Sequence, residues 1–112
     1  LSRFSEERVQ EIIEEHGLPE TTDRTITSED ELLAELRHIR ERGYAVNDEE
    51  LKRGYRSIAV PVFGIDEEVI GAFSVGGPAY RFDLNQPRVD NVVSTLSTSL
   101  DRTEEAIRRN QE

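Results

Sequence analysis

The 112-residue sequence predicts an α+β domain, in which an antiparallel sheet is flanked by helices. Three segments carry apolar residues at the spacing of an amphipathic helix. Between the second and third of them lie runs rich in β-branched residues, and a polar turn separates two of these runs. Helices on both sides of a few strands build a layered sandwich, for which an α/β arrangement remains the alternative.

The first helix is expected over about Ser5–Glu15. Val9, Ile12 and Ile13 fall on one face of it, which is the pattern of a helix packed on one side. Gly17 is expected to end it, because glycine readily takes the left-handed conformation that closes a helix.

The second helix is expected to begin at Ser28, where Glu31 three residues later completes a capping box. Gly43 ends it after two arginines, which are cations that suit a helix C-terminus. The third helix is expected over about Pro87–Asn110. Both carry apolar residues at helical spacing: Leu32, Leu33, Leu36 and Ile39 in the second, and Val89, Val92, Val93, Leu96, Leu100 and Ile107 in the third.

Three strands are expected between these two helices, at Tyr44–Val46, Ser57–Phe63 and Val69–Val75. The segment Gly64–Glu68 is interpreted as the turn of a hairpin, and Gly76-Gly77-Pro78 as the end of its second strand. Three strands make a smaller sheet than the usual ~5–6. The initial leucine and the absence of methionine agree with this, so we expect a piece of a longer protein with further strands upstream.

The formal net charge is −10, and Lys52 is the single lysine. Because contact with phosphates needs clustered cations, this segment is not expected to bind nucleic acid. Abundant carboxylates with scarce lysine favour adaptation to high salt over an ordinary acidic protein. No stretch approaches the ~20 apolar residues of a membrane span, and there is no cysteine. We expect a cytoplasmic protein without cofactor or metal site.

Three motifs follow one another between Glu41 and Arg81, at spacings that match a known pattern without a gap. They are Arg42-Gly43-Tyr44 with Asn47-Asp48-Glu49-Glu50, the run from Gly54 to Val62, and the run from Ser74 to Pro78. They resemble the patterns R-G-Y-x-x-D-D-E-E, G-x-R-C-I-A-A-P-V and S-x-S-G-P in the effector-binding domain of the IclR family of transcriptional regulators. The resemblance identifies residues 1–112 as the C-terminal part of that domain.

The resemblance implies a GAF-like sheet flanked by helices that binds a small organic molecule, often an organic or aromatic acid. It also implies a homodimer or homotetramer that contacts DNA only through a winged-helix domain, which would lie before Leu1. The alternative is a structural dimerisation module with a degenerate pocket. An enzyme is not expected, because the sequence offers no nucleophile–base pair, metal cluster or phosphate loop.

Four positions correspond to pocket residues of the family: Asn47, Ser57, Ser74 and Gly76. The family has an acid at the first, a cysteine at the second and serines at the other two, so only Ser74 keeps the family residue. Asn47 and the serines offer hydrogen-bond donors, whereas Gly76 offers backbone and room. The alternative is that Asn47 is a turn residue and that the serines are small residues for close packing.

Other polar residues favour a structural interpretation. His16 and His38 lie in different helices, so surface positions are expected rather than a metal site. The run Asp48–Glu50 is interpreted as a solvated acidic loop. Core packing is the preferred interpretation of the tyrosines at positions 44, 55 and 80.

The hairpin register decides whether a pocket can exist. Along the first long strand Ser57, Ala59 and Pro61 share a face, and along the second Ala72, Ser74 and Gly76 do. We predict that these small residues lie on the same side of the sheet and the bulky residues on the other. A loop over Gly64–Glu67, with Phe63 opposite Glu68, would place Ser57 opposite Ser74.

Overall fold

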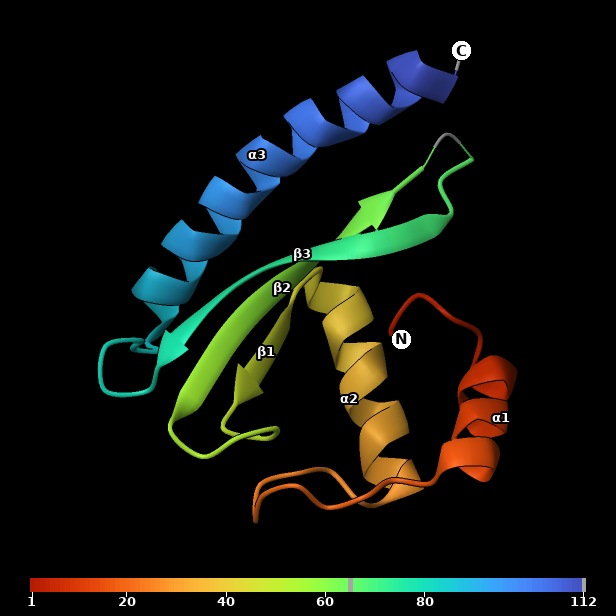
Figure 1. Ribbon diagram of the computed structural model, residues 1–112, viewed down its shortest axis with the longest axis vertical. Helices are drawn as coiled ribbons and strands as arrows, with labels where there is room; N and C mark the ends of the chain where they lie inside the picture. The colour runs from red at the N-terminus through yellow and green to blue at the C-terminus, as the bar shows by residue number, and fades with distance from the viewer. Residues whose placement is uncertain (65, 112) are drawn as a thin grey trace.

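The structure, a computed structural model, describes residues 1–64 and 66–111. A three-stranded antiparallel sheet in the order β1-β2-β3 separates helix α3 on one side from α2 and α1 on the other (Figure 1). The α+β prediction is confirmed, whereas the GAF-like arrangement stays a prediction. The elements are α1 Glu6–His16, α2 Glu29–Arg42, β1 Ala45–Asp48, β2 Tyr55–Phe63, β3 Val69–Pro78 and α3 Gln86–Gln111.

The helices begin and end where the sequence predicts within about two residues. The Ser5 hydroxyl accepts a hydrogen bond from the Arg8 backbone N–H at 3.1 Å. The Ser28 hydroxyl accepts one from the Glu31 N–H at 3.4 Å, which is one arm of the predicted capping box. Gly43 closes α2 with a φ of 87°, a left-handed conformation that favours glycine.

The main hydrophobic core lies between the sheet and α3. Alternate residues of β2, namely Ile58, Val60 and Val62, are buried against it. They pack with Val89 and Leu100, which come from the apolar face of α3. This face of the sheet is therefore the closed one.

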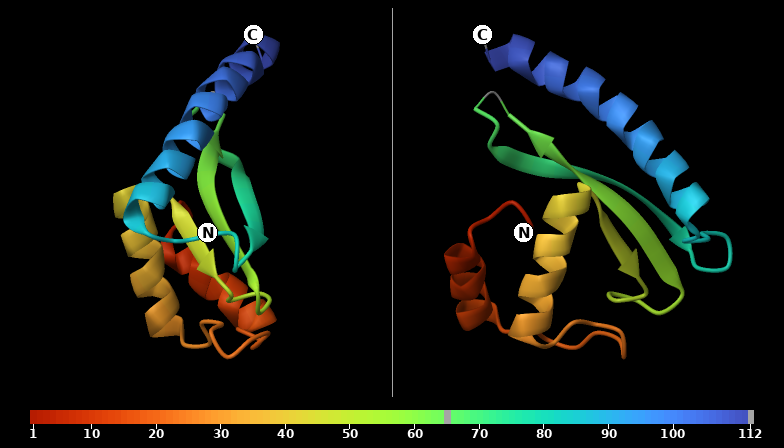
Figure 2. Two further views of the ribbon diagram at one scale, coloured as in Figure 1. Left: turned by 90° about the vertical axis from the view of Figure 1, so that its left-hand side faces the viewer. Right: turned by 180° about the vertical axis from the view of Figure 1, so that it is seen from behind.

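The other face is less tightly covered. Helix α2 packs against α1, while only α3 lies closely along β2 (Figure 2). The radius of gyration is 15.2 Å, above the ~13 Å of a compact 100-residue domain. The chain is thus more extended than a compact domain of this length, and a hollow lies between α2 and the sheet. Within the described residues no helix combines the length and the apolar character that crossing a membrane requires.

The strands are longer than the sequence predicts. β1 continues through Asn47 to Asp48, and β2 begins two residues early, at Tyr55. The predicted stop of the last strand at Val75 is wrong, because β3 continues to Pro78, where β2, with its early start, provides pairing partners for Gly76 and Gly77. Glycine at these positions weakens a strand without preventing its pairing.

The predicted face assignment is confirmed, and the predicted partners are wrong. Ser57 pairs with Gly76, and Ser74 pairs with Ala59. Phe63 pairs with Val69 instead of Glu68, and the register shifts between Val62 and Phe63. The turn is thus longer than the predicted four residues. Residue 65, within that turn, lies outside the described residues.

Candidate functional site

One face of the sheet brings the four candidate residues together. Asn47 pairs with Ser57 across β1 and β2, and Ser57 pairs with Gly76 across β2 and β3. Directly paired residues of antiparallel strands point to the same side, so these three form a row across the sheet. Ser74 lies in the next row, beside Ala59. This is the face that α2 covers.

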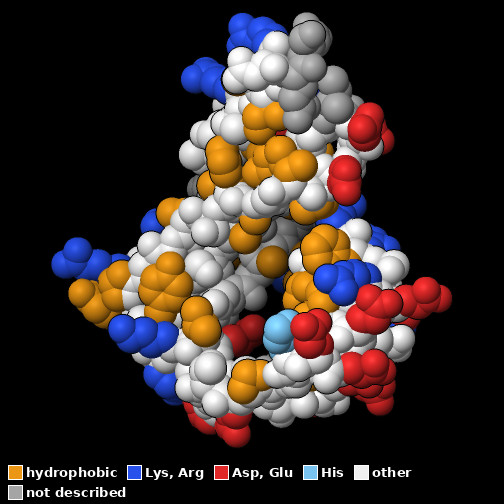
Figure 3. Space-filling view, turned by 45° about the vertical axis from the view of Figure 1, so that its right-hand side comes forward, with side chains coloured by type: hydrophobic (Ala, Val, Ile, Leu, Met, Phe, Trp, Pro, Cys, Tyr) orange, Lys and Arg blue, Asp and Glu red, His pale blue; other side chains and the backbone are white. Residues whose placement is uncertain are grey.

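A cleft of about 210 Å³ lies between α2 and this face. Two of the four candidates, Asn47 and Ser57, line it, whereas Ser74 and Gly76 lie outside it and are exposed. Figure 3 shows the surface hollowed near its centre, with hydrophobic side chains on the walls. The lining residues are Ile26, Leu32, Glu35, Leu36, Ile39, Ala45, Val46, Asn47, Glu50, Ser57 and Ala59.

A second hollow of about 200 Å³ continues the cleft along the sheet. The two share Ile39, Ala45 and Ala59, so they form one groove beneath the small residues of the strands. Its far end is lined by Arg3 and Ala72. Small side chains on this face leave the room that bulky residues occupy on the opposite face.

The side chain of Asn47 is fixed by its own turn. Its Oδ1 accepts a hydrogen bond from the Glu50 backbone N–H at 3.0 Å. This leaves the two N–H donors of the amide available to the cleft. Asn47 thus stabilises the turn that follows β1 and also lines the cleft. The interpretation as a turn residue and the interpretation as a pocket residue therefore both apply to it.

Threonine hydroxyls tie the α1–α2 loop to the turn after β1. Thr22 donates to the Glu49 carbonyl at 2.7 Å and Thr21 to the Glu50 carbonyl at 3.0 Å. Thr25 also donates to the Glu50 carbonyl. We call Thr21, Thr22 and Thr25 the threonine clasp. It holds the backbone next to Asn47 in place.

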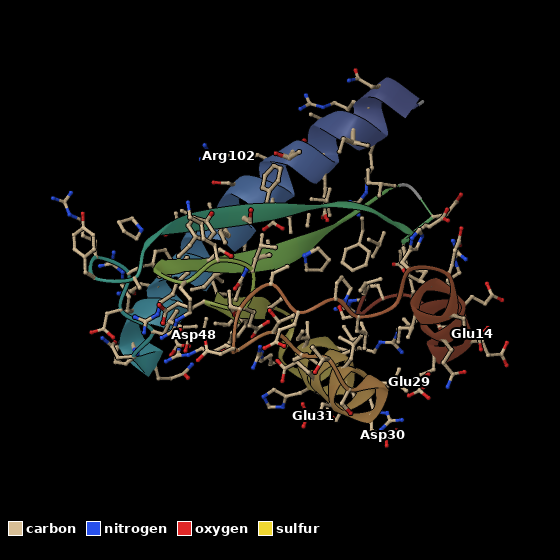
Figure 4. All side chains as sticks on the ribbon, turned by 60° about the horizontal axis from the view of Figure 1, so that its bottom comes forward. Glu14, Glu29, Asp30, Glu31, Asp48 and Arg102 are labelled. Carbon is tan, nitrogen blue, oxygen red and sulfur yellow. The ribbon has the colours of Figure 1, made fainter. Side chains whose placement is uncertain are left out.

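The acidic run after β1 is more structured than the predicted solvated loop. Asp48, labelled in Figure 4, pairs with Arg24 at 3.1 Å and with Arg56 at 2.8 Å. Glu49 pairs with Arg24 at 3.1 Å, and its side chain is only 12% exposed. The prediction is wrong for these two acids because arginines from three different segments converge on them.

Glu50 differs from its neighbours. It lines the cleft, and none of the ion pairs of the described residues includes it. Burial raises the pKa of the Glu50 carboxyl, and the negative charges of Glu35 and Asp48 raise it further. The sequence indicates only a run of negative charges at this position, and no signal in it separates Glu50 from Asp48 and Glu49.

Gly76 does not provide the room that was expected. A Cβ at this position would collide with the Tyr55 hydroxyl and lie 2.9 Å from the Arg56 carbonyl oxygen. Tyr55 therefore fills the space above Gly76, and its core interpretation is wrong, since it is 39% exposed. Odd-numbered residues of β2 point to the same face as Ser57. A predicted strand that began at Tyr55, where β2 begins, would therefore have placed the Tyr55 side chain on this face.

The remaining candidates fall where they contribute nothing to the cleft. Tyr44 packs in the core as predicted, whereas Tyr80 is 82% exposed. His16 and His38 are exposed on separate helices. Among the described residues no group of three or more His, Asp or Glu side chains is placed to hold a metal ion.

A larger groove of about 330 Å³ lies between α3 and β3 and is lined by Val75 and Arg88 among others. None of the four candidate residues lines it. The cleft under α2 is therefore the hollow in which the sequence motifs and the geometry coincide.

Comparison with known proteins places the chain among transcriptional regulators. The family described as "Bacterial transcriptional regulator IclR C-terminal" matches residues 1–102. The regulator KdgR of Escherichia coli is 39% identical over 93 residues, which are 83% of this chain and 35% of that protein. The chain thus spans about a third of the length of that relative.

Solved structures agree with this placement. The C-terminal domain of E. coli KdgR superimposes with a TM-score of 0.86 at 34% identity, over 96% of this chain and 64% of that one. The inducer-binding domain of PobR from Acinetobacter, a double mutant in complex with 3-hydroxybenzoic acid, gives 0.86 at 30% identity, over 92% of this chain and 58% of that one. The chain belongs to the IclR family of transcriptional regulators, to the part of their C-terminal domain that these structures share.

Proposed function

We propose that this chain is the effector-sensing and oligomerising part of a transcriptional regulator, and that it binds a small organic acid in the cleft under α2. The observation that carries the proposal is the row Asn47–Ser57–Gly76, two members of which open into a cleft with apolar walls. Apolar walls with a few converging polar groups are typical of small-molecule sites. The complex of PobR with an aromatic acid supports the ligand class.

The regulator would act in the cytoplasm as a homodimer or homotetramer and contact DNA through a separate winged-helix domain. The net charge of −10 supports this arrangement, in which the present chain does not contact the DNA phosphates. The same charge supports adaptation to high salt.

The test is a thermal-shift screen of small organic acids on the chain and on its Ser57→Ala and Asn47→Ala variants. A ligand that binds only the folded state raises the melting temperature by mass action. We expect at least one acid to do so, and either substitution to weaken the effect. Ser99→Ala, an exposed serine on α3, is the matched control and should respond like the unmodified chain.

The alternative is a structural module whose pocket no longer binds a ligand. The exposure of Ser74 and the filling of the Gly76 position by Tyr55 favour it. In that case no acid shifts the melting temperature, while the oligomer measured by light scattering is retained.

A further inference from the structure

We propose that the Glu50–Asn47 end of the cleft binds a hydroxyl group of the effector, and that Glu50 excludes a carboxylate from this end. The inference rests on the function proposed above, because it assigns the orientation and the chemical class of that effector. It predicts a hydroxy acid that enters with its hydroxyl group under Asn47.

The polar groups at this end form a mixed set. The Glu50 carboxylate only accepts hydrogen bonds, whereas the free Asn47 amide N–H groups only donate them, since Oδ1 is already occupied. The Ser57 hydroxyl can do either. A ligand hydroxyl matches this set, because it can donate to Glu50 and accept from Asn47 at the same time.

A ligand carboxylate does not match it. Such a group has acceptors only, so it would offer Glu50 no further donor beyond the Asp48 backbone N–H and would bring two negative charges together. No Lys, Arg or His lines this cleft within the described part of the chain. Arg42, which lies beside the lining residue Glu35, is already engaged with it at 3.2 Å.

The charges around Glu50 strengthen the discrimination. Glu35 on α2 and Asp48 on β1 both act on it with the same sign, and Asp48 is occupied by Arg24 and Arg56. None of the ion pairs among the described residues includes Glu50, so its negative charge is not neutralised at the cleft.

The groove offers another place for the acid group of a ligand. It runs from Glu50 along Ala45 and Ala59 to its far end, which Arg3 lines. A hydroxy acid can therefore set its carboxylate away from Glu50 while its hydroxyl group stays beside Asn47. The apolar walls at Leu36 and Ile39 accommodate the carbon skeleton between the two groups.

The test uses matched probes in which one hydroxyl is replaced by a carboxylate. The pairs are glycolate with malonate, 3-hydroxypropionate with succinate, and 3-hydroxybenzoate with isophthalate. Dissociation constants are measured by calorimetry at neutral pH for the chain, for Glu50→Gln and for Glu14→Gln. Glu14 is an exposed acid on α1, so its substitution makes the same change of charge far from the cleft.

We expect the unmodified chain to bind at least one hydroxy acid about tenfold or more tightly than its diacid partner, because of like-charge repulsion. Glu50→Gln should bring the two affinities close together by improving the diacid, and Glu14→Gln should leave the ratio unchanged. Circular dichroism checks that each variant is folded.

Two results would overturn the inference while leaving the sensing function intact: equal affinity of the unmodified chain for both members of each pair, or a ratio that Glu50→Gln leaves unchanged. If no probe binds any of the three proteins, both the sensing function and this inference are contradicted.

Discussion

Glu50 is a carboxylate that folding places in an unfavourable electrostatic position. Its pKa is raised above its ordinary value, so the folded protein binds its proton more tightly than the unfolded chain does. Binding of this proton contributes to the free energy of unfolding. The contribution is fully present below the ordinary pKa of a glutamate and is lost as the pH rises through the raised pKa. The ionised side chain thus lowers the free energy of unfolding at neutral pH.

Glu50→Gln should therefore stabilise the chain at neutral pH, by less than about 1 kcal/mol because solvent screens a half-exposed group. The gain should vanish in acid, below the ordinary pKa of glutamate. Urea unfolding of both proteins across this pH range measures it. Glu14→Gln provides the control, and an equal gain at all pH values would contradict the assignment.

Alternation along the strands was the residue-scale feature that could be predicted. It groups the small residues of each strand on one face, and a register whose paired numbers sum to an odd value, as in Ser57 with Gly76, then places Ser57 and Ser74 on the same side. The partners could not be predicted, because they depend on a register shift at Val62/Phe63, where Ile70 packs 3.2 Å from the Cβ position of Gly64. The role of Glu50 could not be predicted either, because it depends on which neighbouring acids find arginines.

At the scale of elements, the threonine clasp joins two loops that are about 27 residues apart. Thr22 is 8% exposed, donates to the Glu49 carbonyl and accepts from the Arg24 N–H at 3.0 Å. Thr22→Val keeps the shape of the side chain and removes its hydroxyl, which leaves buried polar groups without a partner.

We expect Thr22→Val to cost about 1–3 kcal/mol in the free energy of unfolding. It should also weaken effector binding, because the clasp holds the turn beside Asn47. Thr27→Val, at an exposed position before α2, should cost little. Denaturant unfolding separates the two variants, and equal costs would show that the clasp hydroxyl does not contribute.

For helices, the sequence signals were sufficient, since the caps at Ser5, Ser28 and Gly43 depend on local chemistry alone. The ends of the strands were predicted less accurately than the ends of the helices. Whether Gly76 and Gly77 continue β3 depends on a partner strand that lies some twenty residues away.

At the scale of the whole molecule, the acidic charge is spread over the surface. Figure 4 shows Glu29, Asp30 and Glu31 at the start of α2 and Glu14 on α1, all directed away from the sheet. If this charge is an adaptation to salt, the melting temperature should rise between low and molar KCl, as the Debye length falls from ~10 Å at 0.1 M to ~3 Å at 1 M.

Scanning calorimetry across this KCl series is the measurement. A variant with Glu14→Gln and Glu15→Gln removes two exposed charges and should show a shallower rise. A flat or falling curve for the unmodified chain would exclude the salt adaptation and leave the family assignment unchanged.

The same net charge of −10 predicts that the chain does not bind duplex DNA. In a mobility-shift assay at low salt, where electrostatic attraction would be strongest, micromolar chain should leave the duplex unretarded. Clear retardation of the duplex would contradict the proposal that DNA is contacted only through a separate domain.

The position of β3 at the edge of the described sheet has a consequence for amide exchange. Every second backbone N–H of residues 69–77 points toward β2, and the intervening ones point away from it. Deuterium should therefore replace protons along this strand in an alternating slow and fast pattern. Addition of another strand to this edge would slow the fast set selectively, so the pattern reports directly on whether the sheet has been extended.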